Sequence, residues 1–191
     1  MHHFIVPATV VVLGATSSAL AAETYHLEKT HADLLFSIDH AGFTQKHGSF
    51  RDFDGTLQYD AGKPENSTVE ITVKTDSLET ALAARDKDLK GENFLDTAKY
   101  PEMRFVSTRV VPGPNQTLRI EGNLTLHGVT KPLTLQAKLN KVGPNPFDKR
   151  PTLGFSAASS LKRSDFGITR AIPLIGDDVT ITMDVEFNHA L

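Results

Sequence analysis

Histidine is the first residue type in this sequence to examine for chemistry, because histidines at close spacing bind metal ions. None of the histidines after the first few residues shows the HxxH or HExxH spacing with which neighbouring histidines hold zinc. His40 and His47 bracket a loop and could meet in space, so a metal site stays open as the alternative. Hydrogen bonding at turns is the interpretation we favour. We predict no metal site. The residues concerned are His26, His31, His40, His47, His127 and His189.

Serine and carboxylate residues form no recognisable catalytic arrangement either. The chain has no G-x-S-x-G turn to expose a nucleophilic serine, and Ser159 and Ser160 lie in a strand-like run. Carboxylate pairs such as Asp52 and Asp54 lie beside turns, where solvated acidic residues are common, and a glycosidase-type pair is the less favoured alternative. The chain has no cysteine, which excludes thiol chemistry and disulfides. The sequence therefore predicts no catalytic residue and a protein that is not an enzyme.

Two arginine-containing motifs are the most distinctive charged groups. They are Arg85-Asp86 and Arg163-Ser164-Asp165. Arginine and aspartate that meet at a barrel rim form charge-assisted, bidentate hydrogen bonds, which would lock a covering helix in place. Alternatively, an arginine could hold the polar head of a ligand, and the two roles are compatible. The head-group candidates are His40, Arg85 and Arg163.

Strands must position these groups, because most of the chain alternates between apolar and polar residues. In residues 179–187 every second residue is apolar and those between are polar. Such a strand buries one face and exposes the other. Short connections rich in Gly, Pro and Asn favour antiparallel neighbours. The predicted strands are residues 23–30, 34–40, 49–60, 68–76, 103–111, 118–127, 133–142, 153–162 and 179–188.

One segment departs from this alternation. Residues 80–90 are rich in Ala, Leu, Asp and Lys and have helical spacing, which predicts a short helix that ends at Gly91. Asp76 and Glu79 stand three residues apart just before the segment, as a capping box would place them. A helix between the strands of a barrel covers an opening, so we expect this one near the mouth.

Composition and charge exclude several classes of protein. The chain has 191 residues and a formal net charge of -3, with no block of Lys and Arg, so the basic footprint of a nucleic-acid-binding protein is missing.

Residues 4–13 are apolar and are followed by Ala19-Leu20-Ala21, the pattern of a secretory signal peptide. The alternative, an uncleaved membrane anchor, would need about 20 apolar residues. We expect a signal peptide over 1–21, a single domain over 22–191 without a transmembrane segment, and a periplasmic location.

A series of short motifs runs along the predicted domain. They are THADLLFSIDH at 30–40, GSF at 48–50, FDGTL at 53–57, LET at 78–80, RDKDL at 85–89, FLD at 94–96, YP at 100–101, FVS at 105–107, GNLTLHGVTKP at 122–132 and KRSDFGI at 162–168. In this order and spacing, the motifs resemble those of the YceI-like family of exported, lipocalin-like, polyisoprenoid-binding proteins. The resemblance covers essentially the whole domain.

This resemblance implies an all-β fold with a cavity. The family fold is an extended antiparallel lipocalin-like β-barrel of about eight strands, with a short helix near the mouth and an apolar tunnel. The tunnel would take the chain of an isoprenoid lipid, quinone-like or polyprenyl, and no catalytic cofactor is implied. From the residue pattern alone, a solid core and a lined cavity are equally favoured; the resemblance favours the cavity.

The alternation of apolar residues predicts which side chains point into the lumen. Phe50 and Phe53 cannot share one regular strand face, so we expect an irregularity between them. The predicted lumen residues are Phe36, Ile38, Phe53, Leu57, Val73, Phe94, Met103, Phe105, Leu124, Leu126, Leu135, Phe155, Ile168 and Met183.

These observations lead to one functional hypothesis and two alternatives. We expect a periplasmic protein that binds, stores or transports an amphiphilic isoprenoid lipid. The first alternative is a barrel with a filled core that acts through its surface as a stress-response or interaction module. The second is an enzyme of isoprenoid or quinone metabolism. The lipid is the expected partner, nucleic acid is not, and a homodimer is compatible with the sequence.

Overall fold

The computed structural model describes residues 22–190, and the expected signal peptide over 1–21 lies outside them. The strands are β1 (Glu23–His40), β2 (Thr44–Phe50), β3 (Phe53–Tyr59), β4 (Thr68–Lys74), β5 (Leu78–Glu79), β6 (Glu102–Pro112), β7 (Thr117–Leu126), β8 (Val129–Pro144), β9 (Pro151–Lys162) and β10 (Ile175–His189), with the helix α1 at Ala83–Lys90. Within residues 22–190, no helix is both long enough and apolar enough to span a membrane.

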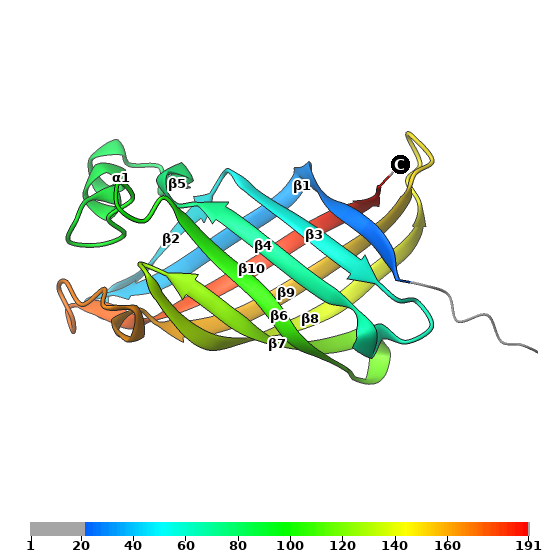
Figure 1. The fold of residues 1–191 in the computed structure, drawn as a ribbon. Coiled ribbons are helices and arrows are strands. Elements are labelled where there is room, and N and C mark those ends of the chain that lie inside the picture. Colours follow the sequence, from blue (N-terminus) through cyan, green and yellow to red (C-terminus); the bar gives the residue numbers. More distant parts are fainter. Residues whose placement is uncertain (1–21, 191) are drawn as a thin grey trace, which may run out of the picture.

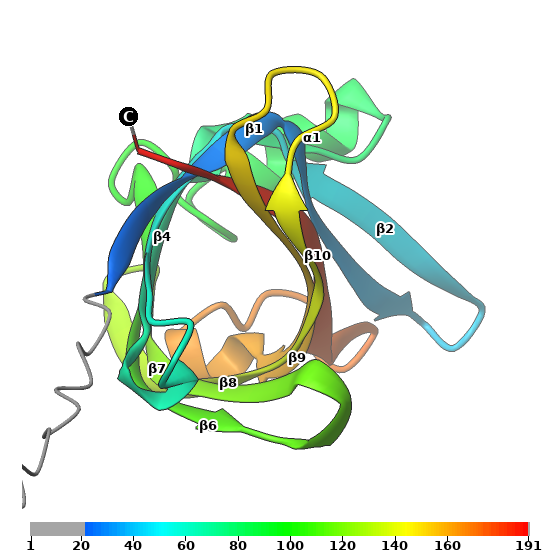
Figure 2. The ribbon, with the colours of Figure 1, turned by 90° about the vertical axis from the view of Figure 1, so that its right-hand side faces the viewer.

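An antiparallel barrel of eight strands forms most of the molecule (Figures 1 and 2). The strands follow one another around it in the order β10-β9-β8-β7-β6-β4-β3-β1, and pairing between β1 and β10 closes the ring. In β10, Met183 and Val185 are buried, whereas Thr182 and Asp184 are exposed. The alternation in the sequence therefore becomes an apolar interior and a polar exterior, and the expected all-β barrel is confirmed.

The strand β1 is long enough to pair with two different strands along the same edge. Its first residues pair with β3, and residues 35–40 pair with β2, which projects from the ring of strands (Figure 2). The sequence predicted one strand over 49–60, but the chain breaks at Arg51 and Asp52, and β2 then pairs with β5. Phe50 and Phe53 are buried on either side of this break, which confirms the expected irregularity. The break is the point at which the chain passes from the projecting hairpin into the barrel.

The helix α1 begins three residues later than predicted, because Ala81, with a φ of 61°, adopts a left-handed conformation before the helix, and this turn is held by Asp86. Its carboxylate accepts a hydrogen bond of 2.8 Å from the backbone N–H of Thr80, and the N-cap residue Leu82 is extended. The predicted end is confirmed, since Gly91 is the C-cap residue and its N–H donates to the carbonyl of Asp88.

The predicted capping by Asp76 and Glu79 is wrong. Asp76 lies in a turn of 3₁₀ helix at Thr75–Ser77. Glu79 lies in β5, and its carboxylate accepts a hydrogen bond of 2.8 Å from Arg51. Capping requires a side chain directly before the first turn, and residues 80–82 separate both carboxylates from α1. The α1 segment and residues 163–176 lie at one end of the barrel, and the start of β1 and the end of β10 lie at the other (Figure 1).

Candidate ligand-binding site

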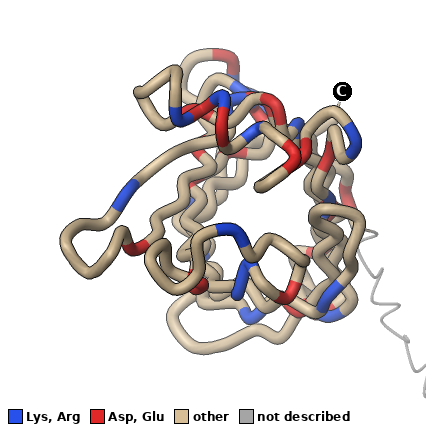
Figure 3. Tube along the Cα trace, turned by 90° about the vertical axis from the view of Figure 1, so that its left-hand side faces the viewer, with Lys and Arg blue, Asp and Glu red and all other residues tan. Residues whose placement is uncertain are grey.

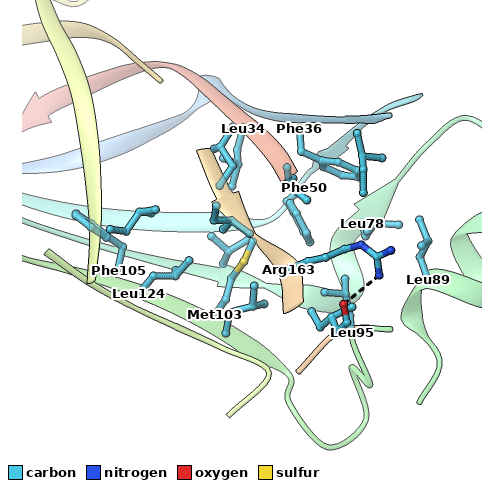
Figure 4. A pocket seen from close by; sticks show the side chains of 18 of the residues that line it. Leu34, Phe36, Phe50, Leu78, Leu89, Leu95, Met103, Phe105, Leu124 and Arg163 are labelled. Carbon is cyan, nitrogen blue, oxygen red and sulfur yellow. Dashed lines mark hydrogen bonds between the residues drawn. The ribbon is translucent and has the colours of Figure 1, made fainter. Parts of the chain in front are cut away.

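A cavity of about 200 Å³ occupies the barrel interior toward the α1 end (Figure 4). Every residue on its wall is apolar except Arg163. The wall consists of Leu34, Phe36, Ile38, Phe50, Ile71, Val73, Leu78, Leu89, Phe94, Leu95, Met103, Phe105, Leu124, Leu126, Leu133, Leu135, Leu161, Arg163, Ile168, Ile175, Val179, Ile181 and Met183. The interior is therefore hollow, and its surface offers a ligand apolar contact almost everywhere.

The helical segment covers the cavity at this end. Leu89 lines the cavity from α1, and Phe94 and Leu95 line it from the loop that follows. The backbone N–H of Leu95 donates to the carbonyl of Leu89 at 3.0 Å, which folds this loop back onto the helix. The helix therefore lies at the mouth, as expected for a covering element.

A second, smaller cavity of about 70 Å³ continues the apolar interior toward the other end. Ile71, Leu135 and Met183 line both cavities, so these side chains form the partition between them. The partition includes an unbranched, adaptable methionine. The two cavities thus lie in line inside one barrel, separated only by side chains.

Arg163 is the one charged residue on the cavity wall, and it is only 5% exposed. Its Nε donates to the carbonyl of Gly176 at 2.8 Å, Nη1 to Ile168 at 3.0 Å and Nη2 to Ile175 at 2.9 Å. Desolvation by burial lowers the pKa of this guanidinium, and the carboxylate of Asp177 partly opposes that change. A guanidinium carries five N–H groups, so the three carbonyls leave it further donor capacity beside the cavity.

The other two head-group candidates are placed differently. Arg85 donates from Nε to the hydroxyl of Thr80 at 2.8 Å and from Nη2 to the Thr80 carbonyl at 2.6 Å. His40 is exposed at the end of β1 and does not line the cavity. Within residues 22–190, the expected arginine–aspartate hydrogen bonds that would lock the helix do not form, because Arg85 donates to Thr80 and Arg163 donates to the carbonyls of residues 168, 175 and 176.

Most predicted lumen residues do face the cavities, with one exception. Leu57 and Phe155 line the smaller cavity, and Leu135 and Met183 line both. Phe53 lies on the same buried face of β3 as Leu57 and packs in the core, but it lines neither cavity, whereas Phe50 lines the larger one. Those that line the larger cavity are Phe36, Ile38, Val73, Phe94, Met103, Phe105, Leu124, Leu126, Leu135, Ile168 and Met183.

The wall also contains residues that the lumen prediction omitted. Several of those on strands lie two positions from a predicted residue in the same alternation, as Leu133 does beside Leu135, and that signal could have found them. Leu78, Leu89 and Ile175 belong to a two-residue strand, a helix and the first residue of β10. Strand alternation says nothing about such positions, so the sequence carried no signal for them.

The described residues contain no cluster suited to a metal ion. Among residues 22–190, no three His, Asp or Glu side chains come close enough to share one. His40 pairs with Thr44 across the β1–β2 ladder, and His47 pairs with Ser37. The two histidines are therefore offset along the hairpin.

Comparison with known proteins gives the same fold. A family model described as the YceI-like domain matches residues 25–187. Protein YceI of Salmonella arizonae is 41% identical over 177 residues, which cover 92% of this chain and 91% of that protein.

Two solved structures have a similar backbone at low sequence identity, which shows the fold alone. BcnA of Burkholderia cenocepacia has a TM-score of 0.76 at 18% identity, over 84% of this chain and 98% of that chain. A polyisoprenoid binding domain from Saccharophagus degradans, implicated in plant cell wall breakdown, has a TM-score of 0.66 at 14% identity, over 87% of this chain and 98% of that one. The sequence matches and the barrel agree, and the chain belongs to the YceI-like family.

Proposed function

We propose that this protein binds an amphiphilic isoprenoid lipid, quinone-like or polyprenyl, with the tail inside the barrel, and stores or carries it in the periplasm. The apolar cavity is the observation that carries this proposal. An isoprenoid tail has almost no hydrogen-bonding groups, and its transfer into such a cavity is favoured by about 25 cal/mol per Å² of apolar surface removed from water. The alternative, a module with a filled core, would have side chains in place of this cavity.

The size of the cavity suits a branched hydrocarbon chain. An apolar cavity of about 150 Å³ accommodates benzene, which is similar in size to one isoprene unit, and the larger cavity here is about 200 Å³. A longer tail would extend into the smaller cavity by displacing the side chain of Met183, which lies between the two. Selectivity would then follow from the length and shape of the lumen.

Arg163 is the wall residue suited to a polar head group. Its remaining N–H groups could donate to a quinone carbonyl, a hydroxyl or a phosphate oxygen at the α1 end. Its bonds to three backbone carbonyls fix the guanidinium in position, so a ligand would meet a preorganised donor. The polyisoprenoid-binding description of the Saccharophagus degradans domain, which shares the fold, supports the same class of ligand.

A pair of adjacent substitutions in β8 tests the proposal. Leu135 lies on the wall of both cavities, whereas Gln136 is exposed on the outside of the same strand. Leu135→Trp should fill the junction and prevent uptake of a long-chain quinone or polyprenol, and Gln136→Trp should leave uptake unchanged. Native mass spectrometry on detergent-free protein offered each lipid would count the bound molecules. Equal uptake by two folded variants would contradict binding in the lumen, and no uptake by the parent protein would contradict the proposal itself.

A further inference from the structure

Two loops at the α1 end of the barrel join into one exposed surface that is largely apolar. One is the turn between β1 and β2, and the other precedes β10. The backbone N–H of Ala41 donates to the carbonyl of Leu174 at 2.7 Å, and His40 pairs with Ile175, so the two loops lie side by side. We call their exposed uncharged residues the rim patch: Ala41, Gly42, Phe43, Ala171, Pro173 and Leu174.

The rim patch exposes large apolar side chains to solvent. Phe43 is 86% exposed and Leu174 is 69% exposed. Leu82, before α1, is also 53% exposed at the same end of the barrel. Contiguous exposed apolar residues mark interaction surfaces, and here they come from loops that meet through a backbone hydrogen bond.

The rim patch is continuous with the cavity wall. Ile175 follows Leu174 directly and lines the larger cavity. Arg163 donates to the carbonyls of Ile168 and Ile175, and so holds the second loop at both of its ends. The exposed side chains are therefore fixed beside the end of the cavity at which a ligand would enter.

Charges of both signs lie next to the rim patch. Within residues 39–46 and 165–178, the charged residues are Asp39, Lys46, Asp165, Arg170, Asp177 and Asp178, and Lys162 forms ion pairs with the last two. The carboxylate of Asp39 accepts hydrogen bonds from the backbone N–H of Gly42 at 2.8 Å and from Gln45 at 3.3 Å. Arg170 is exposed. Figure 3 views this end and shows charges of both signs around it. Aromatic and aliphatic side chains flanked by basic residues are typical of segments that insert at a membrane interface.

We propose that the rim patch docks this protein on the surface of a lipid bilayer that contains anionic lipid, so that the cavity end faces the membrane. Phe43 and Leu174 insert below the head groups, and Arg170 contacts lipid phosphate. The inference rests on the proposed function in one respect: a lipid held in the cavity must be taken from a bilayer or returned to one, and docking at this end shortens its exposed path.

A matched pair of variants tests docking. Phe147 is 90% exposed in the loop between β8 and β9, at the opposite end of the barrel (Figure 1). We expect F43S/L174S to weaken binding to vesicles of phosphatidylethanolamine and phosphatidylglycerol about tenfold, and F147S to leave it unchanged. Flotation of the purified protein with these vesicles measures the bound fraction. Equal flotation of the two variants, or no flotation of the parent, overturns the inference.

Two further measurements separate docking from its alternatives. Light scattering after size exclusion reports whether F43S/L174S converts a dimer into a monomer, which would make the rim patch an interface between two copies and overturn docking. Titration of a water-soluble, short-chain quinone without vesicles tests the cavity alone. F43S/L174S should bind this quinone as the parent does. A parent protein that floats but binds no quinone would retain docking and lose the proposed function.

Discussion

The carboxylate of Asp86 accepts a hydrogen bond from the backbone N–H of Thr80 at 2.8 Å, across the residues that precede α1. The Thr80 hydroxyl also donates to this carboxylate and accepts from Arg85. No residue of α1 is fully buried, and these polar contacts at Thr80 fix where the helix begins. The element that covers the cavity is therefore held by polar contacts at its N-terminal end and by the packing of Leu89, Phe94 and Leu95 against the core after it.

Replacing Asp86 by Asn should increase local unfolding of residues 80–95, the segment that covers the cavity. The substitution removes the charged acceptor of two Thr80 donors, and loss of such a contact at the start of a helix costs about 1 kcal/mol. Hydrogen exchange of residues 80–95 should accelerate while the barrel strands stay protected. Asp88→Asn, at an exposed position in the same helix, is the control. Unchanged exchange in Asp86→Asn would show that Thr80 does not anchor α1.

Replacing Arg163 by Met should destabilise the whole barrel. Three backbone carbonyls would lose their donor, and each buried unsatisfied group costs about 1–3 kcal/mol. Urea unfolding should therefore give a free energy lower than that of the parent by about 3 kcal/mol or more. Arg170→Met, at an exposed position seven residues later, should stay within about 0.5 kcal/mol. A small effect of Arg163→Met would mean that water replaces the guanidinium.

Replacing Gly122 and replacing Gly154 by alanine should change the stability of the barrel in opposite directions. At Gly122 a Cβ atom would lie 2.4 Å from the Phe105 ring and 2.5 Å from the carbonyl of Val106, whereas at Gly154 it would meet no atom within 4 Å. Gly122→Ala should lose about 1–3 kcal/mol of stability. Gly154→Ala should gain up to about 1 kcal/mol by restricting the unfolded chain. Thermal unfolding of both variants measures these changes in stability relative to the parent protein. A change in the same direction in both variants would contradict the prediction.

Alkaline pH should destabilise the end of the barrel opposite α1. Burial, followed by the hydrogen bond and charge of Glu23, raises the pKa of Tyr25 from 10.0 to about 12. Because the folded state holds this proton more tightly, the contribution to stability is complete below pH 10 and is lost as the pH rises toward 12. Tyr25→Phe should remove that part of the pH dependence, measured as the free energy of unfolding between pH 9 and 12. An identical pH profile in parent and variant would exclude Tyr25 as its source.

The sequence predicted the barrel and 11 of the 23 residues on the wall of its larger cavity, because strand alternation is a local property. The parity that places Met183 inside and Asp184 outside is readable in any window of β10. An irregularity between Phe50 and Phe53 was predicted, but not that it ends one strand and starts another, because that depends on the pairing of β2 with β5. The late start of α1 was not predicted, because it depends on the bond from Thr80 to Asp86. The role of Arg163 was ambiguous because the loop over residues 168–176 must fold back before its carbonyls can accept from the guanidinium.

The pairing of β1 with β10 also determines when the barrel can form. These are the first and last strands of the described chain, and the hydrogen bond from Asn188 to Glu28 spans 160 residues. Contacts between such distant residues make folding slow, because the intervening chain must be ordered first. Until β10 arrives, β1 and β9 present open edges that can pair with other chains. Newly made protein is therefore most vulnerable to aggregation just before its last strand is added, a period in which a chaperone would protect it.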